Sequence, residues 1–122
     1  MIQDPFALYL HVPFCAQKCP YCDFNTYATP KVPEAGYVEA LRHELRMYAA
    51  DPRFTGRKIS TVFWGGGTPS LLSPDGIAAV HQEARQLFGI EGGAEVTLEA
   101  NPSEPSKERY TGYRDAGVNR IS

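Results

Sequence analysis

Short runs of β-forming residues alternate with amphipathic helical segments along the chain, and this order limits the fold more than any other feature. The composition predicts strands at residues 6–12, 58–64, 94–100 and 118–122, and helices at residues 34–50, 73–89 and 106–117. Strands separated by helices pair in parallel through right-handed crossovers. The sequence therefore predicts an α/β fold, and both an open doubly wound sheet and an arc of a barrel satisfy it.

Individual residues sharpen some of these boundaries. The first strand is largely apolar, so we expect both of its faces to be buried. Ser73, followed by a proline and an acid, is a typical helix start, and Gly89 is a natural helix end. Gly112 weakens the middle of the last helix. His43 and His81 fall on helices, where we expect them at the surface.

Three unusual loops follow the first three predicted strands. The first holds the cysteines, the second is the glycine run 65–67 with Thr68 and Pro69, and the third is the segment 99–102. Ligands of parallel sheets and barrels bind at the carboxyl ends of the strands. We therefore expect the three loops to meet at one rim and to form the functional site there.

Composition and charge exclude several classes of protein. The chain has 122 residues, of which 43% are hydrophobic and 21% charged, so it can bury a core. Its net charge of −2 and the lack of a basic stripe argue against nucleic acid as a partner. No stretch is apolar for long enough to span a membrane, and the first residues do not resemble a secretory signal. We expect a cytoplasmic location.

All three cysteines, Cys15, Cys19 and Cys22, fall within eight residues. An odd number at this spacing does not make a disulfide framework, and in a cytoplasmic chain it indicates a metal or cluster site. Four-iron clusters are usually held by four thiolates, so three would leave one iron open to a small molecule. A Cys3His zinc site, with His11 or a distant histidine, and three unligated thiols are the alternatives.

The glycine run lets a ligand approach the backbone and is expected to expose N–H donors to a carboxylate. It lacks the ending of a Walker A motif and the spacing of a dinucleotide fingerprint, so a simple tight turn is the alternative. Glu99 at the rim could accept hydrogen bonds from a cationic ligand, or it could be a solvated acid at a strand end. Taken alone, Tyr9 is typical of a core aromatic residue.

The cysteine loop, with Tyr21 before the third cysteine, resembles the cluster motif of the radical S-adenosylmethionine (SAM) superfamily. Segments 9–15, 63–70 and 98–102 resemble the oxygen-independent coproporphyrinogen III oxidase family. Oxidases of that family carry a further cysteine at the position of Phe24. The run Asp23-Phe24-Asn25 resembles instead the HemW-type haem chaperone branch.

The resemblance implies a fold and a set of ligands. Residues 1–122 would form the N-terminal portion of a partial (β/α)6 TIM-like barrel, three βα units plus a fourth strand, without the rest of the barrel or the C-terminal region. It implies that Cys15, Cys19 and Cys22 ligate a [4Fe-4S] cluster, whose open iron SAM chelates through its amino and carboxylate groups. The residues matched to SAM contacts are Tyr9, Gly66, Gly67, Thr68 and Glu99. No catalytic side chain is implied.

The resemblance leaves three functions open. The first is a haem chaperone that carries the cluster and SAM, binds haem in the complete protein and passes it to apoproteins. The second is an oxidase of porphyrin biosynthesis, which cleaves SAM reductively to decarboxylate coproporphyrinogen. Both need an electron donor for the cluster. The third is a truncated chain without activity of its own.

Overall fold

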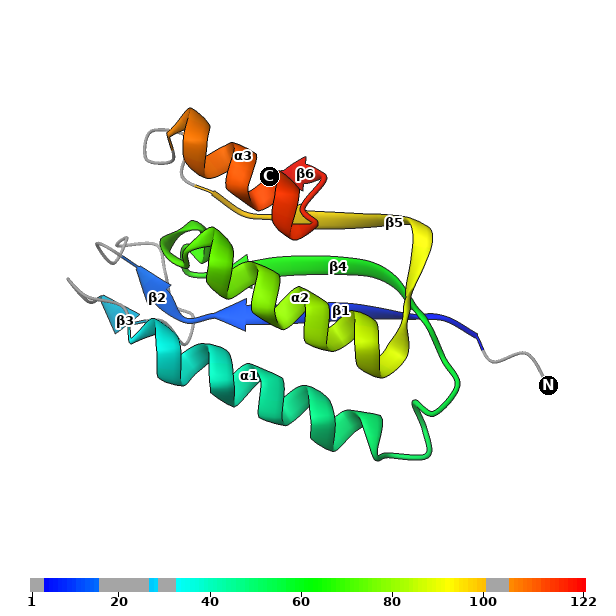
Figure 1. Cartoon of the computed structure of the whole chain (residues 1–122). Coiled ribbons are helices and arrows are strands. Elements are labelled where there is room, and N and C mark those ends of the chain that lie inside the picture. Colours follow the sequence, from blue (N-terminus) through cyan, green and yellow to red (C-terminus); the bar gives the residue numbers. More distant parts are fainter. Residues whose placement is uncertain (1–3, 16–26, 29–32, 101–105) are drawn as a thin grey trace.

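The computed structural model describes residues 4–15, 27–28, 33–100 and 106–122 (Figure 1). Its elements, in chain order, are β1 (Phe6–Val12), β2 (Phe14–Cys15), β3 (Tyr27–Ala28), α1 (Glu34–Ala49), β4 (Ile59–Gly66), the 3-10 turn η1 (Pro69–Leu71), α2 (Pro74–Phe88), β5 (Ile90–Leu98), α3 (Lys107–Ala116) and β6 (Arg120–Ile121). The predicted α/β class is confirmed.

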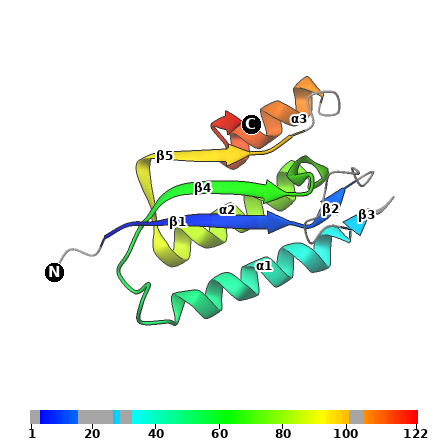
Figure 2. The same ribbon diagram turned by 180° about the vertical axis from the view of Figure 1, so that it is seen from behind.

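The main sheet has the order β1-β4-β5-β6, and all its neighbouring strands are parallel. Each strand lies beside the one that precedes it in the βα sequence, and the helices α1, α2 and α3 all lie on the same side (Figures 1 and 2). A doubly wound sheet carries helices on both faces. The arrangement is therefore the arc of a barrel.

The core lies between the sheet and the helices. Leu10 and Val12 of β1, Val62 and Trp64 of β4, and Leu98 of β5 point to this side and are buried. The opposite side is the helix-free face, where none of the described helices lies, and it carries Tyr9, His11, Phe63, Gly65 and Glu99. Tyr9 is 57% exposed, so the expectation that both faces of β1 are buried is wrong.

Glycine changes two strand boundaries. β4 runs through Gly65 and Gly66, two residues beyond the prediction, because these residues pair with His11 and Val12 of β1. β5 begins at Ile90 instead of residue 94. Its pairing with β4 shifts register after Ile90, and the exposed Gly92 and Gly93 lie in the resulting irregularity.

The predicted helix ends are confirmed in detail. The Ser73 hydroxyl accepts a hydrogen bond from the Gly76 amide at 3.1 Å, and the Ser106 hydroxyl accepts one from the Arg109 amide at 3.1 Å. Gly89 and Gly117 end α2 and α3 with φ values of 81° and 122°, which favour glycine. Within the described residues no helix is both long and apolar enough to cross a membrane.

A second, two-stranded sheet was not predicted. Phe14 pairs with Tyr27 and Cys15 pairs with Ala28, in parallel. The two strands are very short, and their sequences show no run that would have indicated them. They hold together the chain before and after residues 16–26.

His81 does not lie at the surface as expected. Its side chain is buried on α2, with Nε2 3.1 Å from a guanidinium nitrogen of Arg85. A Cβ atom on Gly117 would lie 2.6 Å from Nε2 of His81, so the end of α3 packs directly on the imidazole. Burial, followed by the charge of Arg85, lowers the pKa of His81. His43, by contrast, is exposed as predicted.

This burial makes the stability of the fold depend on pH. The unfolded chain takes up a proton near the ordinary imidazole pKa of about 6.5, whereas folded His81 does so only at lower pH. Stability should therefore fall as the pH drops below about 6.5, because the unfolded state binds more protons. We expect His81→Gln to reduce the loss of unfolding free energy between pH 7.5 and 5.5, measured by urea denaturation. His43→Gln is the control, and an equal reduction there would contradict the prediction.

Candidate functional site

The carboxyl ends of β1, β4 and β5 meet at one edge of the parallel sheet (Figure 2). Glu99 follows β5 directly, and its Oε1 accepts a hydrogen bond from the amide of Gly66, the last residue of β4, at 3.1 Å. A polar cleft of about 230 Å³ at this edge is lined by Gly67, Thr68, Glu99, Ala100 and Ser122. The described parts of the three loops therefore converge as expected.

The amides of the glycine run have partners within the chain. The Gly67 amide donates to the Val12 carbonyl at 2.7 Å, and the Thr68 amide donates to the Phe14 carbonyl at 2.8 Å. With Gly66 bound to Glu99, none of these three amides is available to a ligand carboxylate. The expectation of exposed N–H donors is wrong for them, because the parallel pairing with β1 continues into the loop. These bonds instead fix the glycine run against the segment that leads into the cysteines.

Gly65 has no side chain, and three neighbouring side chains occupy the space beside its Cα atom. A Cβ atom at this position would lie 2.8 Å from Glu99 Oε1, 2.8 Å from Phe63 Cε1 and 2.9 Å from the Tyr9 hydroxyl oxygen. Three side chains thus approach one point above a backbone that has no side chain of its own. Real Cβ atoms do not come so close to their neighbours, so glycine is required here for this arrangement.

Tyr9 is not the core residue that its type alone suggests. It stands on the helix-free face, stacked on Phe63 with ring centroids 5.9 Å apart. Partial burial, and then the negative charge of Glu99, raise the pKa of its hydroxyl. Tyr9 is therefore a neutral hydrogen-bond donor beside a carboxylate at neutral pH.

His11 lies one step further along the same face. A Cβ atom on Gly66 would lie 2.8 Å from His11 Nδ1, so the imidazole covers the end of β4. The backbone of His11 is fixed from the other side, because the Tyr37 hydroxyl donates to its carbonyl oxygen. Burial, with contributions from Glu44 and Tyr9, raises the pKa of Tyr37 to about 12, so this donor keeps its proton.

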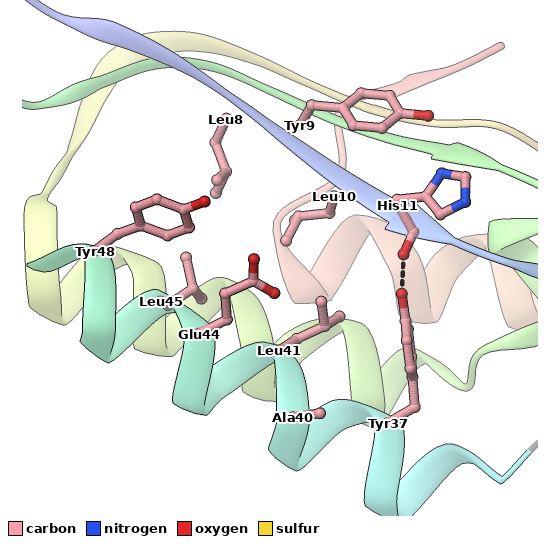
Figure 3. Close-up of a pocket in the computed structure, with 10 residues that line it drawn as sticks. All are labelled: Leu8, Tyr9, Leu10, His11, Tyr37, Ala40, Leu41, Glu44, Leu45 and Tyr48. Atoms are coloured by element: carbon pink, nitrogen blue, oxygen red, sulfur yellow. Dashed lines mark hydrogen bonds between the residues drawn. The ribbon is translucent and has the colours of Figure 1, made fainter. Parts of the chain in front are cut away.

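A separate cavity of about 330 Å³ lies between β1 and α1 (Figure 3). Leu8, Leu10, Leu41 and Leu45 form its apolar walls, while Tyr9 and His11 project from the other side of the strand. Tyr37, Glu44 and Tyr48 also line it, but it lies on the helix side of β1 and is not lined by the glycine run or Glu99, so we do not assign the site to it.

Of the three cysteines, only Cys15 lies within the described residues. Cys15 is the last residue of β2, two residues after Pro13. It directly follows Phe14, whose carbonyl accepts the hydrogen bond from the Thr68 amide. Cys19 and Cys22 lie outside the described residues. Only the sequence and the comparisons therefore bear on whether these residues hold a cluster, hold zinc or are free thiols.

The described residues fit a ligand such as SAM, which carries an amino group and a sulfonium charge. Glu99 supplies a carboxylate that lines the polar cleft, and Tyr9 supplies a neutral hydroxyl near that carboxylate. A family model described as the Radical SAM superfamily matches residues 9–122. The chain belongs to the radical SAM superfamily.

Curated relatives narrow the resemblance within the superfamily. The protein named heme chaperone HemW from Escherichia coli is 44% identical over 119 residues, which cover 97% of this chain and 31% of the relative. HemW from Haemophilus influenzae is 43% identical over 121 residues, covering 97% of this chain and 32% of the relative. A bovine protein named radical S-adenosyl methionine domain-containing protein 1, mitochondrial, is 44% identical and covers 95% and 26%. The chain thus spans less than a third of these relatives.

A solved structure supports the fold. Coproporphyrinogen III oxidase (HemN) from Escherichia coli, described as a radical SAM enzyme, superposes with a TM-score of 0.86 at 34% identity. The match covers 96% of this chain and 27% of the oxidase. The arc of strands described above therefore corresponds to the N-terminal part of a radical SAM barrel.

The sequence pointed to Gly66, Gly67 and Thr68 but missed Gly65 and Phe63. Strand register would have found them, because Gly65 pairs with His11 and Phe63 pairs with Tyr9. Residues that alternate along paired strands share a face, so Tyr9 and His11 predict the helix-free face once β4 is placed beside them.

Replacing Gly65 tests the packing at the rim. We expect Gly65→Ala to lower the free energy of unfolding by about 1–3 kcal/mol, the usual cost of overpacking, because the methyl group would collide with Glu99, Phe63 and Tyr9. Urea denaturation measures the change. Gly93→Ala is the control in β5, since a Cβ atom there meets no atom within 4 Å. An equal loss in both variants would contradict the assigned crowding.

Proposed function

We propose that this chain provides the cluster- and SAM-binding part of a haem chaperone of the HemW type. The observation that carries the proposal is the 43% and 44% identity to HemW proteins over 97% of the chain. Phe24, at the position where the oxidases carry a further cysteine, supports the same branch. Haem binding and haem transfer to apoproteins are proposed for proteins of the relatives' full length.

Cys15, Cys19 and Cys22 are the proposed ligands of a [4Fe-4S] cluster. Three thiolates in one short segment suit a cluster with one iron free for another ligand. The cluster, reduced by an external electron donor, supplies single-electron chemistry to bound SAM. The hydrogen bonds from Gly67 and Thr68 to the carbonyls of Val12 and Phe14 support a role for the glycine run beside the cysteine segment.

Residues at the rim would hold SAM by charge and shape. Glu99 attracts its positive groups, and the Gly66 amide orients that carboxylate by donating to Oε1 at 3.1 Å. Tyr9 donates a hydrogen bond from the helix-free face, and its raised pKa keeps the hydroxyl neutral. Gly66, Gly67 and Thr68 would contribute the shape of the cleft more than amide donors, because their amides are already bound.

The alternative function is oxidative decarboxylation of coproporphyrinogen. Its support is the likeness to HemN at 34% identity and a TM-score of 0.86. The shared cysteine, glycine and glutamate motifs do not separate the two functions, because both need the same cluster and SAM. A cytoplasmic location remains our prediction.

Metal and cofactor loading test the proposed ligands. We expect anaerobic reconstitution to give about four iron and four sulfide ions per chain, and each Cys→Ala variant to lose most of them. Zinc bound without sulfide would overturn the cluster.

Glutamate substitutions test the SAM site separately. Glu99→Gln should raise the SAM dissociation constant about ten- to hundredfold, because a charged hydrogen bond is lost. Equilibrium dialysis with the reconstituted protein measures this change. Glu95→Gln is the matched control four residues earlier, on β5, where Glu95 forms an ion pair with Arg120 at 3.2 Å. Equal binding by the two variants would remove Glu99 from the site.

Haem and coproporphyrinogen distinguish the chaperone from the oxidase. We expect a protein of the relatives' full length that carries this segment, reconstituted with its cluster, to bind haem near one equivalent in an absorbance titration. It should release no carbon dioxide from coproporphyrinogen with dithionite and SAM. Turnover without haem binding would establish the oxidase function instead.

A further inference from the structure

The segment between the glycine run and α2 is a tight turn that carries Thr68 at its start. The Leu71 amide donates to the Thr68 carbonyl at 3.0 Å, and the Leu72 amide donates to the Pro69 carbonyl at 3.0 Å. Ser70 and Leu72, which belong to this segment, are buried. The carbonyl groups of Ser70 and Leu72 need partners there, because a buried carbonyl without one is costly.

Two side chains of α3 supply those partners. The Tyr113 hydroxyl lies 2.8 Å from the Ser70 carbonyl and 2.7 Å from the Leu72 carbonyl. The Nη2 of Arg109 lies 3.0 Å and 2.8 Å from the same two oxygens, and its Nε donates to the Tyr113 hydroxyl at 2.9 Å. A hydroxyl has one proton to donate, whereas Nη2 has two, so the pair can satisfy both carbonyls together.

A glycine allows α3 to come this close. A Cβ atom on Gly112 would lie 2.7 Å from Cγ of Pro74, the first residue of α2. Gly112, which weakens the helix by its propensity, therefore lets α3 lie against the start of α2 (Figure 1). Without this approach, Tyr113 and Arg109 would not reach the turn.

The far end of the turn is held by α1. The Glu34 carboxylate accepts hydrogen bonds from the Ser73 amide at 2.7 Å and from the Ser73 hydroxyl at 2.5 Å. It sits above Gly76, where a Cβ atom would lie 2.8 Å from Oε2. The turn is therefore fixed from α1 at one end and from α3 in its middle.

We infer that Arg109 and Tyr113 are positioning residues for the ligand site, holding η1 so that Thr68 and the glycine run keep the shape that binds SAM. This rests on the proposed function. Packing alone does not account for Tyr113. Its ring is completely buried, and an apolar ring would fill the same space. The tyrosine hydroxyl adds a hydrogen bond to the turn that follows the cleft residues. Polar groups buried in this way fix one backbone arrangement among several.

Hydrogen exchange on the cluster-free protein provides the first test. We expect Arg109→Met and Tyr113→Phe, singly and together, to accelerate exchange of the amides of residues 67, 68 and 70–72. Arg114→Met and Tyr110→Phe are the controls, because they make the same changes on α3 without removing these hydrogen bonds. Unchanged exchange in the double variant would overturn the inference, whether or not the wild type binds SAM.

SAM affinity provides the second test, on the reconstituted protein. The double variant should bind SAM about tenfold more weakly with unchanged iron content. The conservative variant Arg109→Lys should lose less SAM affinity than Arg109→Met. Val80→Ala removes buried core volume from α2 and serves as a control for lost stability. An equal loss of affinity in Val80→Ala at a comparable melting temperature would overturn the positioning role. A wild-type protein that binds neither cluster nor SAM would overturn the proposed function instead. The hydrogen-exchange result would still decide whether Arg109 and Tyr113 hold the turn.

Discussion

Parallel pairing of β1 with β4 and of β4 with β5 is the constraint on which the site depends. The pairing sets His11 beside Gly65 and Val12 beside Gly66, and it brings Trp64 beside Leu98 so that Glu99 emerges next to the glycines. One register therefore decides which residues meet at the rim. A slip of one residue would turn Tyr9 and His11 toward the helices and Leu10 toward the helix-free face, because side chains alternate along a strand.

The same pairing changes the role of the glycines. A glycine run suggests free amides, but here the amides of Gly66, Gly67 and Thr68 bind Glu99 and the β1 side of the rim. What the glycines provide is the absence of side chains where neighbours crowd Gly65, and a φ of 111° at Gly66, where a Cβ atom would also lie 2.6 Å from the Val12 carbonyl oxygen. Binding would then come from the Glu99 carboxylate and the Tyr9 hydroxyl, which approach each other over Gly65.

Much of the fold follows from local chemistry in the sequence. Ser73 and Ser106 cap helices as their types predict, Gly89 and Gly117 end them, and the order of strands and helices gives the α/β class. Contacts between distant segments could not be predicted in the same way. His81 has an ordinary helical position, and only the approach of Gly117 at the end of α3 buries it. The two-residue strands β2 and β3 have no local signal at all.

The rim is exposed on one side and supported on the other. On the helix-free face, Tyr9 and Glu99 lie at the surface and at the cleft, where a ligand can reach them. On the helix side, Arg109 and Tyr113 hold the turn that leads from the glycine run, and they do so through backbone carbonyls. Substitutions on the two sides should therefore separate. A change at Glu99 would remove a proposed ligand contact and leave the turn in place, whereas a change at Tyr113 would remove no ligand-contacting side chain but loosen the backbone that carries Thr68. The oddly placed Gly112 belongs to this second group, because its weak helix propensity is offset by the close packing that brings α3 to the turn.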